Sequence, residues 1–266
     1  MSGEARASSV HISVDPAGRY LPSPPRGSRQ SLNSYGALRR PMCGRFALYA
    51  YMRQLMEEFG LDEHEDLEDV QRYNVAPSHR VLAVVSDGES NHMEVLKWGF
   101  VPHWAKGSKP RYMINARAET VAEKPTFRSA FKARRCLVLA DGFYEWKRSG
   151  KVRVPMFIRD TSGRPWGFAG IYETWNSPEG DEVTTCAIIT TEANEVMSQV
   201  HHRMPAIIHE EDRATWLDPS VADPEVLLPM LRPYESDRME VFPVSDEVNS
   251  PRNDHPGLIK RQDGVW

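Results

Sequence analysis

Cys43 has the most distinctive potential chemistry in this chain, because it directly follows a methionine in the run Met42-Cys43-Gly44-Arg45-Phe46. If Met42 starts the reacting chain and is removed, Cys43 carries a free α-amine beside its thiol. The pKa of an α-amine is about 8, so part of it is neutral near neutral pH and can attack an aldehyde. The thiol can then close onto the imine carbon to give a thiazolidine ring. The alternative is a buried, inert cysteine, the commonest state of the free residue.

Glu145 is a candidate proton carrier, because it lies in an aromatic, strand-like run over residues 141–146. Period-two alternation places Phe143 and Glu145 on one face of a strand, and Tyr144 and Trp146 on the other. A carboxylate among bulky aromatics loses water, which raises its pKa toward the working range of a general acid or base. The alternative is an exposed glutamate on the wet face of the strand.

Two further polar segments carry groups that suit catalysis or binding. His201 and His202 follow a predicted helical segment over 193–200, and histidine is the usual proton shuttle near neutral pH. Asn115 and Arg117 lie in a second segment, where the amide can hold an amine or a carbonyl and the guanidinium suits phosphate. The alternatives are a surface histidine pair and an asparagine that caps a turn.

The overall composition is that of an ordinary globular protein. The 266 residues include 33 Lys and Arg against 37 Asp and Glu, and 40% are hydrophobic. No apolar run reaches the roughly 20 residues of a membrane-spanning helix, which excludes that class. The three cysteines, Cys43, Cys136 and Cys186, are too widely spaced for a disulfide framework or a zinc site. We therefore expect a cytoplasmic protein without metal or cofactor, with Cys136 and Cys186 in the core.

The chain divides into an extension, one domain and a tail. Residues 1–42 are rich in Ser, Pro and Arg, contain no Phe or Trp, and are predicted to be disordered. This extension has three alternative interpretations. The translation start is assigned too far upstream, the segment is removed by proteolysis, or it stays attached and prevents the reaction of Cys43. Residues 43–245 are predicted to form a single domain, and residues 246–266 an irregular tail.

The domain is predicted to be mostly β-structure. Leu48, Met52, Leu55 and Phe59 recur at helical spacing, and Gly60 follows as a stop signal. Short helical segments are expected near 126–133, 193–200, 209–217 and 224–232. Strands are expected over 80–86, 94–101, 135–147, 154–159, 166–174 and 183–191. The pattern predicts an α+β fold, an antiparallel barrel-like sheet with peripheral helices.

Basic residues concentrate in one stretch of this otherwise acidic domain. Residues 97–135 carry ten Lys and Arg against two Glu, and Trp98, Phe100, Trp104 and Tyr112 lie among them. Basic groups beside aromatics are typical of a groove for single-stranded nucleic acid. The alternative, which composition alone favours, is a solvated face over core aromatics.

Six segments in order resemble the SRAP family, the SOS response-associated peptidases that process abasic sites. The matching segments are 42–46, 72–77, 98–102, 115–120, 140–146 and 201–205. The resemblance implies a sensor of abasic sites in single-stranded DNA that forms a thiazolidine crosslink and protects the lesion in the SOS response to DNA damage. It implies that Cys43 is the nucleophile, that Asn115 positions the cysteine, that Glu145 handles protons and that His201 promotes opening of the sugar ring.

The same resemblance implies a surface for the DNA strand. The implied DNA-binding residues are Arg45, Asn74, Pro77, Trp98, Trp104, Arg117 and Thr190. The expected partner is single-stranded DNA containing abasic sites, bound by a cytoplasmic, DNA-associated monomer with no membrane contact. The alternative functions are a thiol autopeptidase and, if Cys43 is not amino-terminal, a non-covalent single-stranded DNA binder. A Schiff-base lyase side activity is a further hypothesis.

Overall fold

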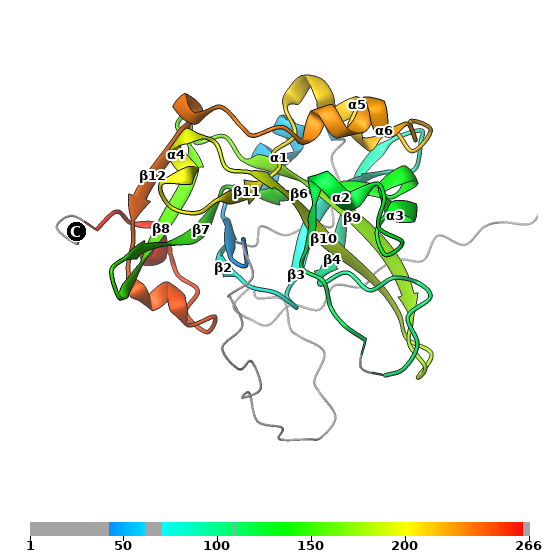
Figure 1. Cartoon of the computed structure of the whole chain (residues 1–266), viewed down its shortest axis with the longest axis horizontal. Coiled ribbons are helices and arrows are strands. Elements are labelled where there is room, and N and C mark those ends of the chain that lie inside the picture. The colour runs from blue at the N-terminus through cyan, green and yellow to red at the C-terminus, as the bar shows by residue number, and fades with distance from the viewer. Residues whose placement is uncertain (1–42, 62–70, 109, 263–266) are drawn as a thin grey trace, which may run out of the picture.

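The computed structural model describes residues 43–61, 71–108 and 110–262. The predicted disorder of residues 1–42 lies outside this part of the chain. Within it, the chain folds into a closed barrel and a second sheet, with short helices at the periphery (Figure 1). Figure 1 shows the barrel strands on the right, β7, β8 and β12 on the left, and α1, α5 and α6 along the top. The predicted α+β class and barrel-like sheet are confirmed.

The barrel forms because its last long strand pairs with both ends of the strand series. β10 pairs with β4 and with β9, and the order between them is β4-β3-β6-β9. The pairing of β10 with β4 is parallel, and the others are antiparallel. Closure removes exposed strand edges. The strands are β3 (Arg80–Ser86), β4 (Asn91–Trp98), β6 (Arg135–Ala140), β9 (Trp166–Asn176) and β10 (Glu182–Glu192).

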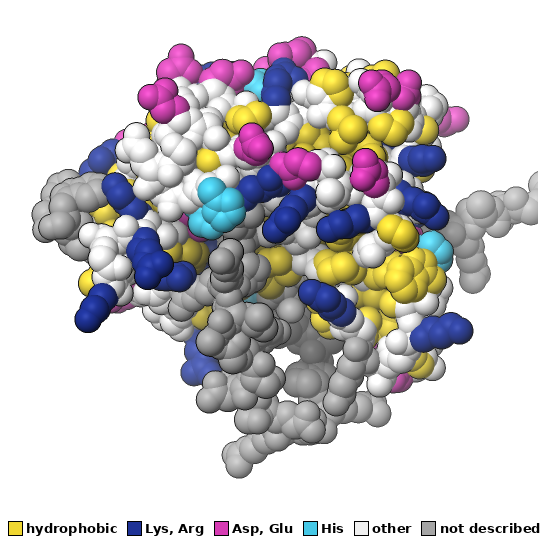
Figure 2. All heavy atoms as spheres, viewed as in Figure 1, with side chains coloured by type: hydrophobic (Ala, Val, Ile, Leu, Met, Phe, Trp, Pro, Cys, Tyr) yellow, Lys and Arg dark blue, Asp and Glu magenta, His cyan; other side chains and the backbone are white. Residues whose placement is uncertain are grey.

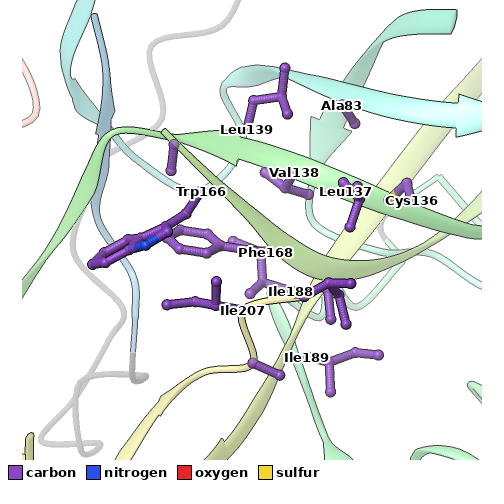
Figure 3. Packing of buried hydrophobic residues seen from close by; sticks show 14 of the residues in the cluster. Ala83, Cys136, Leu137, Val138, Leu139, Trp166, Phe168, Ile188, Ile189 and Ile207 are labelled. Atoms are coloured by element: carbon purple, nitrogen blue, oxygen red, sulfur yellow. The ribbon is translucent and has the colours of Figure 1, made fainter. Parts of the chain in front are cut away.

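The interior of the barrel is filled by apolar side chains from facing strands. Figure 3 shows Leu137, Phe168 and Ile188 among the side chains that pack there, and all three are buried. β6 and β9 approach so closely that a Cβ at Gly170 would lie 2.6 Å from the sulfur of Cys136. Cys136 and Cys186 have no exposed surface, which confirms that both belong to the core.

A second sheet carries the start of the domain and has the order β12-β8-β7-β1-β2. The predicted single strand over 135–147 is wrong, because the chain leaves the barrel at Asp141 and enters this sheet. The Asp141 carboxylate accepts hydrogen bonds from the backbone N–H groups of Tyr49 and Ala50, which fixes the corner. The strands are β1 (Phe46–Leu48), β2 (Arg72–Val75), β7 (Gly142–Ser149), β8 (Val152–Asp160) and β12 (Met239–Pro243).

Helices and two short strands complete the frame. Helix α1 (Met52–Phe59) buries Met52, Leu55 and Phe59, and it ends at Gly60 in a left-handed conformation (φ 61°), as predicted. β5 (Asn115–Arg117) and β11 (Arg203–Pro205) both pair with β10. The other helices are α2 (Ala118–Val121), α3 (Arg128–Ala133), α4 (Glu195–Ser198), α5 (Arg213–Leu217) and α6 (Pro224–Leu227). Single 3-10 turns are η1 (Glu210–Asp212), η2 (Leu228–Leu231) and η3 (Ser236–Arg238).

The segment that we expected to be an irregular tail is packed on the second sheet over residues 246–262. It contains two 3-10 turns, η4 (Asp246–Asn249) and η5 (Pro256–Ile259). Val248 and Leu258 are fully buried against a cluster that includes Tyr144. This segment therefore supports the sheet that carries β1 and β7.

Candidate active site

The pairing of β1 with β7 brings Cys43 to Glu145, although 102 positions separate them in the chain. Phe46 pairs with Phe143, and the carbonyl of Arg45 accepts a hydrogen bond from the N–H of Tyr144. Continuing this antiparallel register carries the start of the domain past Glu145. The backbone nitrogen of Cys43 donates a hydrogen bond to Oε1 of Glu145 at 2.6 Å.

Both members of this pair are buried, which sets their protonation. Glu145 is 5% exposed, and this burial raises its pKa, while the hydrogen bonds from the N–H groups of Cys43 and Trp146 hold the pKa down. Burial also raises the pKa of the Cys43 thiol well above its ordinary value. The carboxylate of Glu145, to which the thiol is hydrogen-bonded, raises that pKa further. The predicted desolvation of Glu145 is confirmed, and the thiol is held in its neutral form.

The backbone of Cys43 has an unusual conformation. Its φ is 45°, a left-handed value that residues other than glycine rarely adopt. This torsion exists only while a residue precedes Cys43, because φ is defined by the preceding carbonyl carbon. A chain that begins at Cys43 has an amine in place of this amide and is free of the associated strain.

His201 lies between α4 and β11, and its ring is half-buried. Its backbone N–H donates to the carbonyl of Met197, and its Nδ1 accepts a hydrogen bond from the N–H of Arg203 at 3.2 Å. Burial lowers the pKa of His201, and the neighbouring His202 ring, whose centroid lies 4.3 Å away, contributes to the shift. The neutral ring therefore carries its proton on Nε2, which is the nitrogen left for a substrate.

Two arginines connect these groups electrostatically, and sequence reasoning did not select either. Arg203 lowers the pKa of both Cys43 and His201, and Arg153 lowers the pKa of both Glu145 and His201. Their charges thus reach the three titratable groups among the four predicted catalytic residues. Arg203 directly follows the histidine pair in the segment 201–205, which was among the segments that resemble the family. Arg153 lies on β8 opposite Arg148 and has no motif of its own.

Arg203 is also a structural anchor. It is buried, its guanidinium pairs with the carboxylate of Glu119, and it donates to the carbonyl of Thr190 at 2.5 Å. The guanidinium of Arg203 thus joins β11, on which it lies, to β10 and to the start of α2. It therefore fixes the strand pairing on which His201 and Asn115 depend.

Asn115 lies on β5, which pairs with β10 on the side opposite to β11. It is the first residue of β5, where it pairs with Ile188 of β10, and it is partly buried. The indole N–H of Trp98 donates to the carbonyl of Ile114, which holds the strand from inside the barrel. β10 therefore lies between the strand of Asn115 and the strand that follows His201.

Three of the residues predicted to contact DNA are buried and hold other groups in place. Asn74 has no exposed surface, accepts a hydrogen bond from Arg45 at 2.7 Å, and donates to carbonyls of the 246–262 segment. Trp98 and Thr190 are also buried, and the Thr190 hydroxyl donates to the carbonyl of Ala116. Any effect of these side chains on DNA binding passes through the residues that they support.

The other predicted contacts reach the surface. Trp104 is 56% exposed, Arg117 is exposed, and Pro77 and Arg45 are partly buried. Figure 2 shows Lys and Arg side chains across the middle of one face, with Asp and Glu along its upper edge. The aromatic residues of the basic stretch are divided between core and surface, since Trp98 and Phe100 are core residues while Trp104 is exposed.

Neither a metal site nor a membrane span is found in the part of the chain that the structure describes. Over those residues, no three His, Cys, Asp or Glu side chains cluster in a way that could hold a metal ion. No helix there is long and apolar enough to cross a membrane.

The fold and site define a class of barrel proteins in which a buried cysteine contacts a buried carboxylate. The family model "SOS response associated peptidase (SRAP)" matches residues 42–251, and the chain belongs to this family. It is 47% identical over 222 residues to abasic site processing protein YoqW of Bacillus subtilis, covering 82% of this chain and 99% of YoqW. It is 32% identical over 224 residues to abasic site processing protein YedK of Escherichia coli, covering 82% and 99%. A crystal structure of a Bacteroides thetaiotaomicron protein matches with a TM-score of 0.73 and 27% identity, covering 83% of this chain and all of that one.

Proposed function

We propose that this protein recognises abasic sites in single-stranded DNA and binds them covalently through an amino-terminal Cys43. The observation that carries this proposal is the 2.6 Å hydrogen bond between the Cys43 nitrogen and Glu145. This hydrogen bond places a buried carboxylate beside the nitrogen that becomes the nucleophilic amine in a chain that begins at Cys43. The names of relatives such as YoqW, which describe abasic site processing, support the choice of substrate.

The reaction follows from the two groups of Cys43. The amine attacks the aldehyde carbon of the ring-opened sugar, and the resulting carbinolamine loses water to give an imine. The sulfur then adds to the imine carbon, and the thiol proton passes to the nitrogen, which closes a thiazolidine. The net change is the loss of one water molecule. The closed ring removes the aldehyde and so protects the site during the damage response.

Glu145 is the proton carrier for these steps. Its carboxylate takes a proton from the nitrogen of Cys43 as the carbinolamine forms and delivers it to the departing hydroxyl, which leaves as water. It then accepts the proton of the thiol, to which it is hydrogen-bonded, and passes it to the nitrogen as the ring closes. A carboxyl whose pKa is raised by burial is suited to both directions of transfer.

His201 and Asn115 have supporting roles in this proposal. The Nε2–H of His201 is directed to the sugar oxygen and promotes ring opening, while Asn115 holds the cysteine end in place. Arg117 and Trp104 contact the DNA strand from the surface, with Pro77 and Arg45 beside the site. Asn74, Trp98 and Thr190 maintain the positions of these groups.

We further propose that the reacting form begins at Cys43. The family model starts at residue 42, and the left-handed φ of Cys43 disfavours a preceding peptide bond, and both observations support this form. The raised pKa of the thiol argues against the autopeptidase alternative, because a cysteine peptidase depends on the thiolate.

An insertion variant tests the role of the amine while the thiol stays in place. One protein is expressed with Met42 first, and the second has an alanine inserted between Met42 and Cys43. Each is incubated with a labelled oligonucleotide that holds one abasic site, and heat-stable adducts are counted on denaturing gels. We expect an adduct with the first protein and none with the second. Equal adduct formation by the two proteins would refute the proposal.

A further inference from the structure

An exposed aromatic residue on the segment between β4 and β5 has no role in the site described above. Tyr112 is 44% exposed and lies three residues before Asn115, which places its Cα within about 10 Å of that of Asn115 along an extended chain. Figure 2 shows hydrophobic side chains with Lys and Arg among them on the right of this face, where Figure 1 draws this segment.

The backbone on which Tyr112 stands is fixed from both sides. Phe100 and Met113 exchange two backbone hydrogen bonds of 2.9 and 3.0 Å, which bridge the two ends of the segment. Gly99, whose φ is 143°, lies directly against the ring: a Cβ there would be 3.3 Å from Cβ and Cδ1 of Tyr112. Lys97 places its Nζ 5.0 Å from the centroid of the same ring. The ring is therefore held in one place although it faces solvent.

Trp104, on the same segment, is presented in the same way. The carbonyl of Ala105 accepts a hydrogen bond from the indole N–H of Trp175, and His103 contacts the carboxylate of Glu173 at 3.0 Å. These two anchors flank Trp104 and leave its own side chain exposed. The segment thus holds two exposed aromatic rings on an anchored backbone, with Lys106 and Arg111 exposed between them.

We propose that Tyr112 is a second stacking platform, which binds a DNA base on the strand that flanks the lesion. This inference rests on the proposed function of the site. Aromatic rings among cations suit the binding of single-stranded DNA, because bases stack on the rings while phosphates contact the cations. Pre-ordering of the ring by Lys97 and Gly99 lowers the entropy lost when a base binds.

Tyr112→Ala tests the platform with DNA that cannot be crosslinked. The full-length protein binds labelled oligonucleotides that carry a tetrahydrofuran spacer in place of the abasic sugar, and fluorescence anisotropy gives Kd. We expect Y112A to weaken binding by about five- to thirty-fold, in the lower part of the range for base stacking. Y112F keeps the ring and should bind within twofold of the wild type. Tyr51→Ala is the matched control: Tyr51 is also exposed, and it precedes α1, which Figure 1 draws apart from the β4–β5 segment.

A second tetrahydrofuran spacer identifies the stacked base, because it removes one base from the strand. This spacer replaces each flanking nucleotide in turn. We expect the loss of affinity caused by Y112A to disappear at one position and persist at the others. Wild-type affinity of Y112A for every oligonucleotide would overturn the inference, and so would an equal loss at every spacer position, which indicates a general disturbance of the surface. Adduct formation by the wild-type protein expressed with Met42 first is measured in parallel with true abasic DNA. If adducts form and Y112A behaves like the wild type, only the role of Tyr112 fails; if none forms, the proposed function fails.

Discussion

Replacement of Glu145 by glutamine removes a proton carrier and almost nothing else. Glutamine has the same shape and can still accept a hydrogen bond from the Cys43 nitrogen through its Oε1. It cannot take a proton from the amine or the thiol. The variant therefore separates the position of Glu145 from its acid–base chemistry.

The structure indicates a large effect on rate. Glu145 is 5% exposed and already lies 2.6 Å from the Cys43 nitrogen, so water cannot easily take its place. Positioned acid–base groups contribute about 10²- to 10⁴-fold. We expect E145Q to slow adduct formation by about 10³-fold, which corresponds to about 4 kcal/mol of activation free energy.

The assay is a single-turnover time course of adduct formation with abasic oligonucleotide in excess, repeated across pH. The raised pKa of Glu145 means that the wild-type rate begins to fall above the usual glutamate range as the pH is lowered, because the base becomes protonated. E145Q should lack the part of this acidic limb that Glu145 causes and keep the part that protonation of the Cys43 amine causes. Glu58→Gln, which alters a partly buried glutamate on α1 paired with Arg164 and Arg213, is the matched control and should react at the wild-type rate.

An E145Q rate within threefold of the wild type would refute the reasoning. It would mean that the buried carboxylate is a structural neighbour of Cys43 and that the proton moves by another route. An unchanged acidic limb in E145Q would lead to the same conclusion.

Three further predictions concern the histidine pair, the strand corner and the buried amide. His201→Asn keeps an acceptor for the N–H of Arg203 and should slow adduct formation by about 10²-fold in the same time course, whereas the exposed His202→Asn should change it less than threefold. Burial raises the pKa of Asp141 from 3.8 to about 6, so the folded state binds this proton more tightly than the unfolded chain. The unfolding free energy should therefore fall by about 3 kcal/mol from this group as pH rises from about 4 to about 6, and urea titrations of D141N should lack that fall; parallel pH curves would contradict it. Asn74→Ala removes the hydrogen bonds of the amide to Arg45 and to the carbonyls of Ser250 and Asn253, and should lower the unfolding free energy in urea by about 2–4 kcal/mol; a change below about 0.5 kcal/mol would count against that role.

Hydrophobic periodicity predicted the elements whose burial is decided locally. Helix α1 was predictable because Met52, Leu55 and Phe59 share one face and Gly60 ends the helix. The corner at Asp141 was not, because residues on both sides of it are strand-like and only tertiary hydrogen bonds to Tyr49 and Ala50 mark the break. Closure of the barrel through β10 depends on pairing between distant strands, which periodicity does not specify.

The candidate site shows the same division. The aromatic residues around Glu145 made burial one of two alternatives for this residue, but its contact with Cys43 depends on the register of β1 against β7. Arg203 and Arg153 were missed because an arginine that sets local electrostatics has no distinctive spacing. The interior position of Asn74 was equally invisible, since a polar residue in a motif can bind a ligand or support the residue that does. The interior position of Trp98 was one of the two alternatives that the basic stretch left open.

Intact-mass spectrometry of the reaction product tests the central claim most directly. The protein expressed with Met42 first is incubated with single-stranded DNA that holds one abasic site, and the undigested mixture is weighed. The account predicts one new species, whose mass equals the chain from Cys43 plus the oligonucleotide minus one water. A chain that begins at Cys43 and gains no mass would contradict it.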